Sequence, residues 1–280
     1  MKDTRTSIRD ALYEAPGPRA RRKIRIATVI SLAVLAILSV LVIRRFYITG
    51  QLKARYWSFF TRKTTWIFLG KGLAGTIEAA AGAGVMAFAA GLILMLARIS
   101  RNKILRVLVT AVIEFTRGVP TLLFIYFFFL VVPQFGIKIG AYWKVSIPVA
   151  ISACGIVAEV LRSGVNAVPK GQREAAMSIG MKDWHVFSKV VFPQALRYVI
   201  PALISELVIV VKDTTFAYVV NYPDLMQNAK VLISNYDALL SVYLVVAVIY
   251  ILINYLLNRL SVAAARKQNR SVTGPAGSAS

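Results

Sequence analysis

Long apolar runs alternate with polar segments along the chain, and several runs are long enough to cross a bilayer. A membrane-spanning helix needs about 20 residues, and backbone groups in lipid must form their hydrogen bonds within one segment. We therefore expect helices and no strands, in an all-α, polytopic membrane helical bundle with about six transmembrane helices. The expected spans are residues 24–43, 73–97, 107–132, 144–161, 198–220 and 238–258.

The composition supports a membrane protein. Hydrophobic residues make up 58% of the chain and charged residues 16%, whereas soluble domains have about 45–50% and about 25%. The net charge of +22 lies mainly in tails and loops, where it sets orientation and attracts anionic lipid, so we expect no nucleic-acid partner. The single Cys154 excludes an intramolecular disulfide, and the single His185 excludes a multi-histidine metal site.

The distribution of lysine and arginine predicts which ends of the spans face the cytoplasm. Basic residues favour the inner side of a membrane. They gather in segments that all lie inside if the N-terminus is inside, namely residues 1–25, 98–106, 162–197 and 259–270. Residues 44–71 conflict with this orientation, because they would lie outside yet are basic and aromatic, as in an amphipathic stretch at the outer interface. The alternative is that residues 24–43 do not cross.

The segment from Gly70 to Gly75 matches the dinucleotide-binding pattern GxGxxG, but no strand precedes it. Small residues at this spacing instead predict that the helix packs closely against another. The chain has no GxxxxGK(S/T) motif, so we expect it to bind no ATP through a P-loop. No nucleophile–base set stands out, and we expect neither a catalytic site, nor a metal site, nor a cofactor in this chain.

Charged residues inside the expected spans are candidates for a transport site. Glu114 with Arg117, and Glu159 with Arg162, are spaced i,i+3, so each acid shares a helix face with a base. A charge near the membrane midplane costs about 2.5–3.5 kcal/mol and needs a partner helix or a watery cavity. One interpretation is that these groups pair across helices and stabilise the bundle, which we favour for Glu159 and Arg162.

The other interpretation is a polar site near the midplane for a small zwitterion. A cation would hold the carboxylate of the ligand, and an acid would hold its ammonium group. Prolines in the spans, at Pro120, Pro148 and Pro201, would interrupt the helices and free carbonyls to line such a site. The charged residues expected along this pathway are Glu114, Arg117, Glu206, Lys212 and Asp213.

The polar segment 168–201 is longer and more ordered than a simple connection between two spans. Its pattern predicts a helix over Gln172–Ile179 and a second helix over Trp184–Val191. The glycine turn, the cap of the second helix and the start of the returning helix are expected at Gly180, Asp183 and Pro193. The residues expected to fill a groove on a cytoplasmic partner are Ala175, Ala176, Ile179 and Met181, with Gln172, Arg173 and Glu174 at the rim.

Several motifs together resemble the permease subunits of ABC importers for polar amino acids. Glu174-Ala175-Ala176, followed by Gly180 and Pro193, resembles the EAA loop of that family. Further motifs of the family, in chain order, are Gly72 to Ile77, Glu114 to Pro120, Ala158 to Gly164, Phe192 to Arg197 and Lys212 to Thr215. The resemblance implies that Thr214 and Thr215 belong to the substrate pathway, and that Gln172, Glu174, Ala175, Ala176 and Gly180 couple to an ATPase.

The resemblance implies a type I ABC importer permease with five core helices and one additional N-terminal span. It implies three kinds of partner: a cytoplasmic ABC ATPase dimer that binds ATP and Mg, a second and non-identical permease subunit, and an extracytoplasmic substrate-binding protein. The chain would then be a multi-pass protein of the bacterial plasma membrane with both termini in the cytoplasm. Its segments would be a basic tail at 1–23, the extra span and interfacial segment at 24–71, the permease domain at 72–260 with its EAA loop at 168–193, and a disordered tail at 261–280.

The form with an extra N-terminal span resembles actinobacterial glutamate permease subunits, so the expected substrate is glutamate. Glutamine, asparagine, aspartate or basic amino acids remain the alternatives within the family. The alternative in another class is a secondary transporter driven by an ion gradient, whose inner loop would need no partner.

Overall fold

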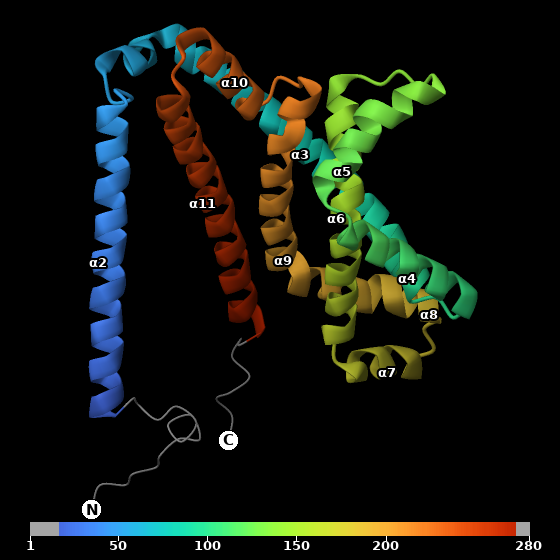
Figure 1. The fold of residues 1–280 in the computed structure, drawn as a ribbon. Helices are drawn as coiled ribbons and strands as arrows, with labels where there is room; N and C mark the ends of the chain where they lie inside the picture. The colour runs from blue at the N-terminus through green and yellow to red at the C-terminus, as the bar shows by residue number, and fades with distance from the viewer. Residues whose placement is uncertain (1–16, 273–280) are drawn as a thin grey trace, which may run out of the picture. The chain divides into compact units, whose positions relative to one another are not determined.

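The computed structural model describes residues 17–272, which contain helices and no strand (Figure 1). The chain forms two units, Met1–Trp57 and Ser58–Ser280. Helices long and apolar enough to cross a membrane are Pro18–Ile48, Lys63–Arg98, Ala141–Ala167, Asp183–Val220 and Leu239–Ala263. A bent pair, Lys103–Gly118 with Thr121–Phe135, makes a sixth span if it is counted as one. The predicted all-α bundle with about six spans is therefore confirmed.

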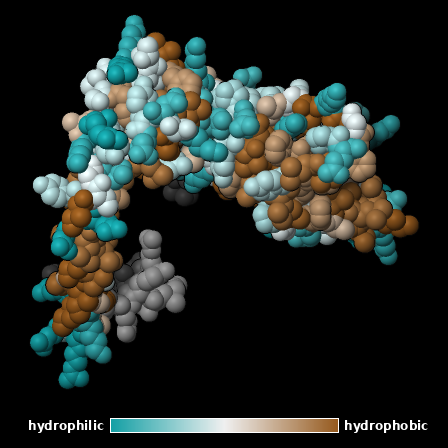
Figure 2. Space-filling view, turned by 45° about the horizontal axis from the view of Figure 1, so that its top comes forward, coloured by the Kyte–Doolittle hydropathy of each residue, from teal (hydrophilic) through white to brown (hydrophobic). Residues whose placement is uncertain are grey.

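The first unit consists mainly of one long helix, α2 (Pro18–Ile48), followed by a 3-10 turn at Ala54–Tyr56. Proline favours the first turn of a helix, and α2 begins at Pro18 rather than at the predicted residue 24. No residue of α2 is buried, and Figure 2 shows apolar side chains along its length with hydrophilic ones at its end. Arg44 and Arg45 belong to α2, so the helix extends into the segment expected to lie in the interface.

The second unit contains the remaining helices. They are α3 (Lys63–Arg98), α4 (Lys103–Gly118), α5 (Thr121–Tyr126), α6 (Ala141–Ala167), α7 (Lys170–Ser178), α8 (Asp183–His185), α9 (Phe192–Asp213), α10 (Leu225–Tyr236) and α11 (Leu239–Val272). Shorter 3-10 and π segments, Ser58–Thr61, Phe127–Val131, Val132–Phe135, Val186–Val191 and Thr214–Val220, adjoin them. The helix predicted to begin at residue 73 begins ten residues earlier, at Lys63.

The span predicted at 107–132 is broken. α4 ends at Gly118 and α5 begins at Thr121, with a bend of 95° between the two parts. Pro120 cannot donate a backbone hydrogen bond, and a residue before proline avoids the helical region. Val119 accordingly has φ −90° and ψ 126°. By contrast, Pro148 and Pro201 lie inside the continuous helices α6 and α9, so their predicted interruption of the spans is wrong.

Helix α6 is the centre of the second unit and packs against α3, α4, α5 and α9 (Figure 1). Glycines allow three of these close approaches. A Cβ added at Gly91 would lie 2.9 Å from the Cys154 carbonyl oxygen, and one at Gly164 would lie 2.8 Å from that of Ala195. At Gly155 it would lie 2.9 Å from the Ile113 carbonyl oxygen of α4. The position of α4, and of the break after it, therefore depends on a glycine in α6.

Helix α10 packs on the glycine face of α3. A Cβ added at Gly72 would lie 2.8 Å from the Asp224 carbonyl oxygen, at the N-terminus of α10. The Leu225 amide donates to the Thr76 hydroxyl at 3.0 Å, and the Asn228 side chain donates to the Phe68 carbonyl at 2.7 Å. The prediction of close helix packing at this GxGxxG segment is confirmed.

Replacing Asp224 by asparagine is expected to stabilise the protein above pH 6 and to change little near pH 4. Asp224 is fully buried, and its carboxylate accepts a hydrogen bond from the Gln227 amide at 2.7 Å. Burial raises the pKa of this carboxyl from 3.8 to about 6. The folded state therefore holds the proton more tightly, and the stability present below about pH 4 is lost as pH rises through 6. Asparagine keeps the cap without the buried charge.

Thermal unfolding of the purified protein between about pH 4 and about pH 8 measures this effect, which reaches about 3 kcal/mol above pH 6. Asp224→Ala is the control, because it removes the charge and the cap together. A stability difference between the asparagine variant and the native protein that stays constant with pH would contradict a buried charge as its cause.

The C-terminal helix α11 continues to Val272. The prediction of disorder from residue 261 is therefore wrong as far as Val272, and residues 273–280 lie outside the described part of the chain. Ser261 is buried, and its hydroxyl donates to the Pro201 carbonyl of α9 at 2.8 Å. This contact fixes the start of the segment against the bundle. In the predicted tail 1–23, residues 18–23 are helical, and residues 1–16 are not described.

Candidate functional site

Helix α7 and the turn after it form the first candidate site. Gly180 has φ +82°, the left-handed conformation that glycine adopts without strain. The Gly180 amide donates to the Met177 carbonyl at 3.0 Å, and the Met181 amide donates to the Ala176 carbonyl at 3.2 Å. These bonds end the helix as in a Schellman motif. The predicted helix and its glycine turn are confirmed, with α7 beginning at Lys170.

The surface of this segment differs from the prediction at Ala176. Ala176 is only 6% exposed and packs within the chain, so it cannot fill a groove on a partner. Met181 is half-buried beside it. Ile179 is 78% exposed as predicted, and the exposed Met177 and Trp184 were missed. The remaining expected coupling residues, Gln172, Glu174, Ala175 and Gly180, are exposed.

The second helix of the segment begins at Asp183, which does not cap it. No side chain caps α8, and the Asp183 carboxylate instead accepts from Arg101 at 2.6 Å and from Arg173 at 3.2 Å. The π segment Val186–Val191 follows α8, and α9 begins at Phe192 with Pro193 in its first turn, as predicted. The prediction that Asp183 caps the second helix is therefore wrong, and the predicted start of the returning helix is confirmed. The ion pairs connect α7 and α8 to the turn between α3 and α4.

A cavity of about 660 Å³ lies between this segment and the end of α3. Leu96 and Val165 line one side, and Trp184 and Phe187 line another. Gln194 of α9 donates to Gln172 of α7 at 3.4 Å. The segment is therefore held at several points while its apolar tip stays exposed.

The second candidate site comprises polar groups at the break between α4 and α5. Arg117 lies in the last turn of α4, and its guanidinium is 3.3 Å from the Glu114 carboxylate. Both side chains are exposed. This ion pair lies on a single helix and, among described residues, includes neither Glu206 nor Asp213.

Asp213 connects three helices near the same break. Its carboxylate accepts a hydrogen bond from the Thr121 hydroxyl of α5 at 2.7 Å. The Thr121 hydroxyl also lies 2.8 Å from that of Ser152 in α6. Thr121 and Ser152 were missed, because a lone hydroxyl in an apolar run carries little sequence signal. Thr121 follows Pro120, and this position next to a helix break was the available clue.

The other expected pathway residues share no side-chain hydrogen bond or ion pair with this cluster among the described residues. Glu206 is buried beside an apolar cavity of about 490 Å³, and one of its oxygens has no hydrogen-bond partner among described residues. Lys212 is exposed and forms no ion pair with a described residue. The Thr214 and Thr215 hydroxyls donate to the Val211 and Lys212 carbonyls. Among the residues expected along the substrate pathway, Asp213 is thus the one whose side chain forms a hydrogen bond with a neighbouring helix in the described part of the chain.

Glu159 joins two helices, as expected for a structural ion pair. Its carboxylate accepts from Arg162 at 2.8 and 3.0 Å within α6. It also forms an ion pair with Arg98, the last residue of α3. The carboxylate therefore stabilises the contact between α3 and α6.

Residues 87–270 match the model of the family described as "Binding-protein-dependent transport system inner membrane component". The glutamate transport system permease protein GluD of Corynebacterium glutamicum is 33% identical over 216 residues, covering 76% of this chain and 79% of the relative. The probable glutamine ABC transporter permease protein GlnP of Bacillus subtilis is 32% identical over 206 residues, covering 72% and 93%.

A solved structure described as an amino acid ABC transporter with histidines has a similar fold. Its TM-score is 0.69 and its sequence identity 28%, over 75% of this chain and 98% of that chain. Fold, motifs and relatives therefore agree on one family. The chain belongs to the binding-protein-dependent transport system inner membrane components and is an ABC importer permease for amino acids.

Proposed function

We propose that the chain is one permease subunit of an ATP-driven importer that carries glutamate across the bacterial plasma membrane. It works with a cytoplasmic ATPase dimer that binds ATP and Mg, a non-identical second permease subunit and an extracytoplasmic substrate-binding protein. Membership of the ABC permease family favours this mechanism over transport driven by an ion gradient.

The observation that carries the proposal is the exposed apolar tip of α7. Ile179 and Met177 are exposed in a segment that lies outside the candidate spans α6 and α9. Large apolar side chains that gather on a surface mark an interaction site. The turn at Gly180 and the ion pairs of Asp183 hold this tip in one orientation. It would enter a groove of the ATPase, with Gln172, Glu174 and Ala175 beside it.

The basic residues support an orientation with both termini in the cytoplasm. The turn between α3 and α4 and the helix ends beside it carry Arg98, Arg101, Lys103 and Arg106, and the turn is joined to α8 by the ion pair of Arg101 with Asp183. If α7 and α8 meet a cytoplasmic ATPase, this basic turn lies at the inner face too. The loops and termini then follow the positive-inside rule, apart from the residues after α2.

Glutamate is the proposed substrate because a glutamate permease is among the relatives, and because the pathway residues offer both charges. In the proposed path, Arg117 and Lys212 attract the carboxylates of the substrate, and Asp213 attracts its ammonium group. Glu206, Thr214 and Thr215 lie along the same helix and its 3-10 extension.

Uptake of labelled glutamate into proteoliposomes tests the proposal. The complete transporter, with its binding protein outside and ATP inside, is expected to accumulate glutamate, and a transporter without the ATPase subunit is not. Unlabelled glutamate should block uptake more strongly than glutamine, asparagine, aspartate or arginine. Stronger block by one of those four would overturn glutamate as the substrate, and uptake without the ATPase would overturn the mechanism.

A further inference from the structure

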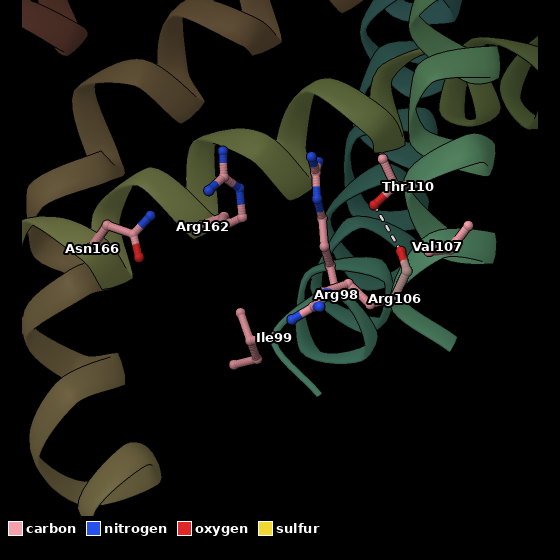
Figure 3. A pocket seen from close by; sticks show the side chains of 7 residues that line it. All are labelled: Arg98, Ile99, Arg106, Val107, Thr110, Arg162 and Asn166. Carbon is pink, nitrogen blue, oxygen red and sulfur yellow. Dashed lines mark hydrogen bonds between the residues drawn. The ribbon is translucent and has the colours of Figure 1, made fainter. Parts of the chain in front are cut away.

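A third cavity, of about 410 Å³, lies where the ends of three helices meet (Figure 3). Its lining includes none of the expected coupling residues and none of the polar cluster around Asp213, although it shares Ile99 and Asn166 with the cavity of about 660 Å³. Arg98 reaches it from the end of α3, Arg106 from the first turn of α4, and Arg162 from α6. The complete lining is Arg98, Ile99, Arg106, Val107, Thr110, Arg162 and Asn166.

The charges around this cavity do not cancel. Glu159 pairs with both Arg98 and Arg162, so one carboxylate is shared between two guanidinium groups. Arg106 is exposed and forms no ion pair with any described residue. Three arginines and one glutamate leave two positive charges at one concave surface. Like charges held together in this way favour the binding of an anion, and guanidinium groups match the geometry of phosphate oxygens.

The cavity also has an apolar side at the level where membrane spans end. Arg98 is the last residue of a candidate span, and α4 begins the next one at Lys103. Val107 is 67% exposed, and Ile99 lines the cavity beside it. The neighbouring α4 residues Ile104 and Leu108 are exposed apolar side chains as well. A ligand here meets cations at one end and an apolar flank at the other.

We propose that this cavity binds the phosphate of an anionic phospholipid, with the acyl chains against the exposed apolar face of α4. Basic pockets between membrane helices on the cytoplasmic side are suited to anionic head groups. Arg106 supplies the unpaired charge, Arg98 and Arg162 supply the rest, and the Asn166 amide offers a further hydrogen-bond donor. The proposal rests on the proposed inner position of the turn between α3 and α4, and not on ATP-driven transport.

Lipid retention by the purified complete transporter tests the site. After exchange into detergent, the protein is incubated with phosphatidylglycerol or with phosphatidylcholine, and bound lipid is measured by native mass spectrometry. Arg106→Gln is expected to lower phosphatidylglycerol retention about fivefold. Lys103→Gln is the matched control, since it removes the same charge one turn earlier without lining the cavity, and it should retain lipid as the native protein does.

Three results would overturn the proposal. The first is equal retention of the two lipids by the native protein, and the second is an equal loss of phosphatidylglycerol in both variants. The third is that excess inorganic phosphate displaces bound phosphatidylglycerol as effectively as excess phosphatidylglycerol does. The last result would identify a free phosphate site instead. Because retention is measured without ATP, preserved lipid binding together with absent glutamate uptake would refute the proposed function and leave this site in place.

Discussion

Replacing Gly180 by valine is expected to lower ATP-driven glutamate uptake about tenfold or more while leaving the protein in the membrane. Gly180 has φ +82°, where an L-residue with a Cβ costs about 1–2 kcal/mol, roughly the free energy of a tenfold change in an equilibrium. A β-branched residue fits that conformation worst. Relief of the strain would break the bonds of Gly180 to Met177 and of Met181 to Ala176, and turn the tip at Ile179. Coupled uptake and ATP hydrolysis by the reconstituted transporter measure the effect.

The matched control is Gly180→Asn, because asparagine tolerates the left-handed conformation far better than valine. A Cβ at residue 180 would meet no atom within 4 Å, so loss of space within the chain cannot explain a defect in the valine variant. The asparagine variant is expected to retain most of the uptake. Full uptake by the valine variant would remove the coupling role of the turn. Equal loss in both variants would show that bulk at the partner surface, and not backbone strain, is responsible.

The sequence predicted those features that depend on neighbours along the chain. Apolar runs predicted the number of spans, because burying about 20 residues in lipid is a local requirement. The turn at Gly180 followed from the end of one helical pattern and the freedom of glycine. The packing of Gly72 against α10 followed from small residues on one helix face, even though the partner helix was unknown.

The errors concern side chains whose partners are distant in sequence. Asp183 matches a helix cap locally, but Arg101 lies across the fold and takes the carboxylate. Ala175 and Ala176 are equally small, and only the packing of α7 on the π segment Val186–Val191 and on α9 decides that Ala176 faces inward. Helix α11 continues past residue 261, where Ser261 contacts Pro201 of α9, and composition does not reveal that contact.

The sequence predicted the charged residues of the polar cluster at the helix break, but it did not predict which residues they contact. Asp213 was expected from its position in a membrane span, where charged groups need partners. Its partner is the Thr121 hydroxyl of α5, which lies next to the break after Gly118 and also contacts the Ser152 hydroxyl of α6. The predicted i,i+3 pair of Glu114 and Arg117 is confirmed, and both side chains are exposed within this chain.

Replacing Asp213 by alanine is expected to lower glutamate uptake about tenfold or more without loss of the assembled transporter. If the carboxylate attracts the ammonium group of the substrate, losing it removes one charge-assisted hydrogen bond, worth about 1.5–3 kcal/mol. Asp213→Asn removes the negative charge but keeps the hydrogen bond, because the amide oxygen of asparagine still accepts from the Thr121 hydroxyl. We expect the asparagine variant to be as defective as the alanine variant. Initial uptake rates over a range of glutamate concentrations, with assembly checked by size-exclusion chromatography, measure both.

Thr121→Val provides the complementary test, since it removes the hydroxyl between Asp213 and Ser152 and keeps the carboxylate. A neutral hydrogen bond contributes about 0.5–1.5 kcal/mol, so uptake is expected to fall only a few-fold. Normal uptake by Asp213→Asn together with a severe defect in Thr121→Val would reverse the interpretation. Asp213 would then hold α5 against α9 at the helix break, and the charge that receives the ammonium group would have to be sought at Glu206, where a buried carboxylate oxygen has no partner among the described residues.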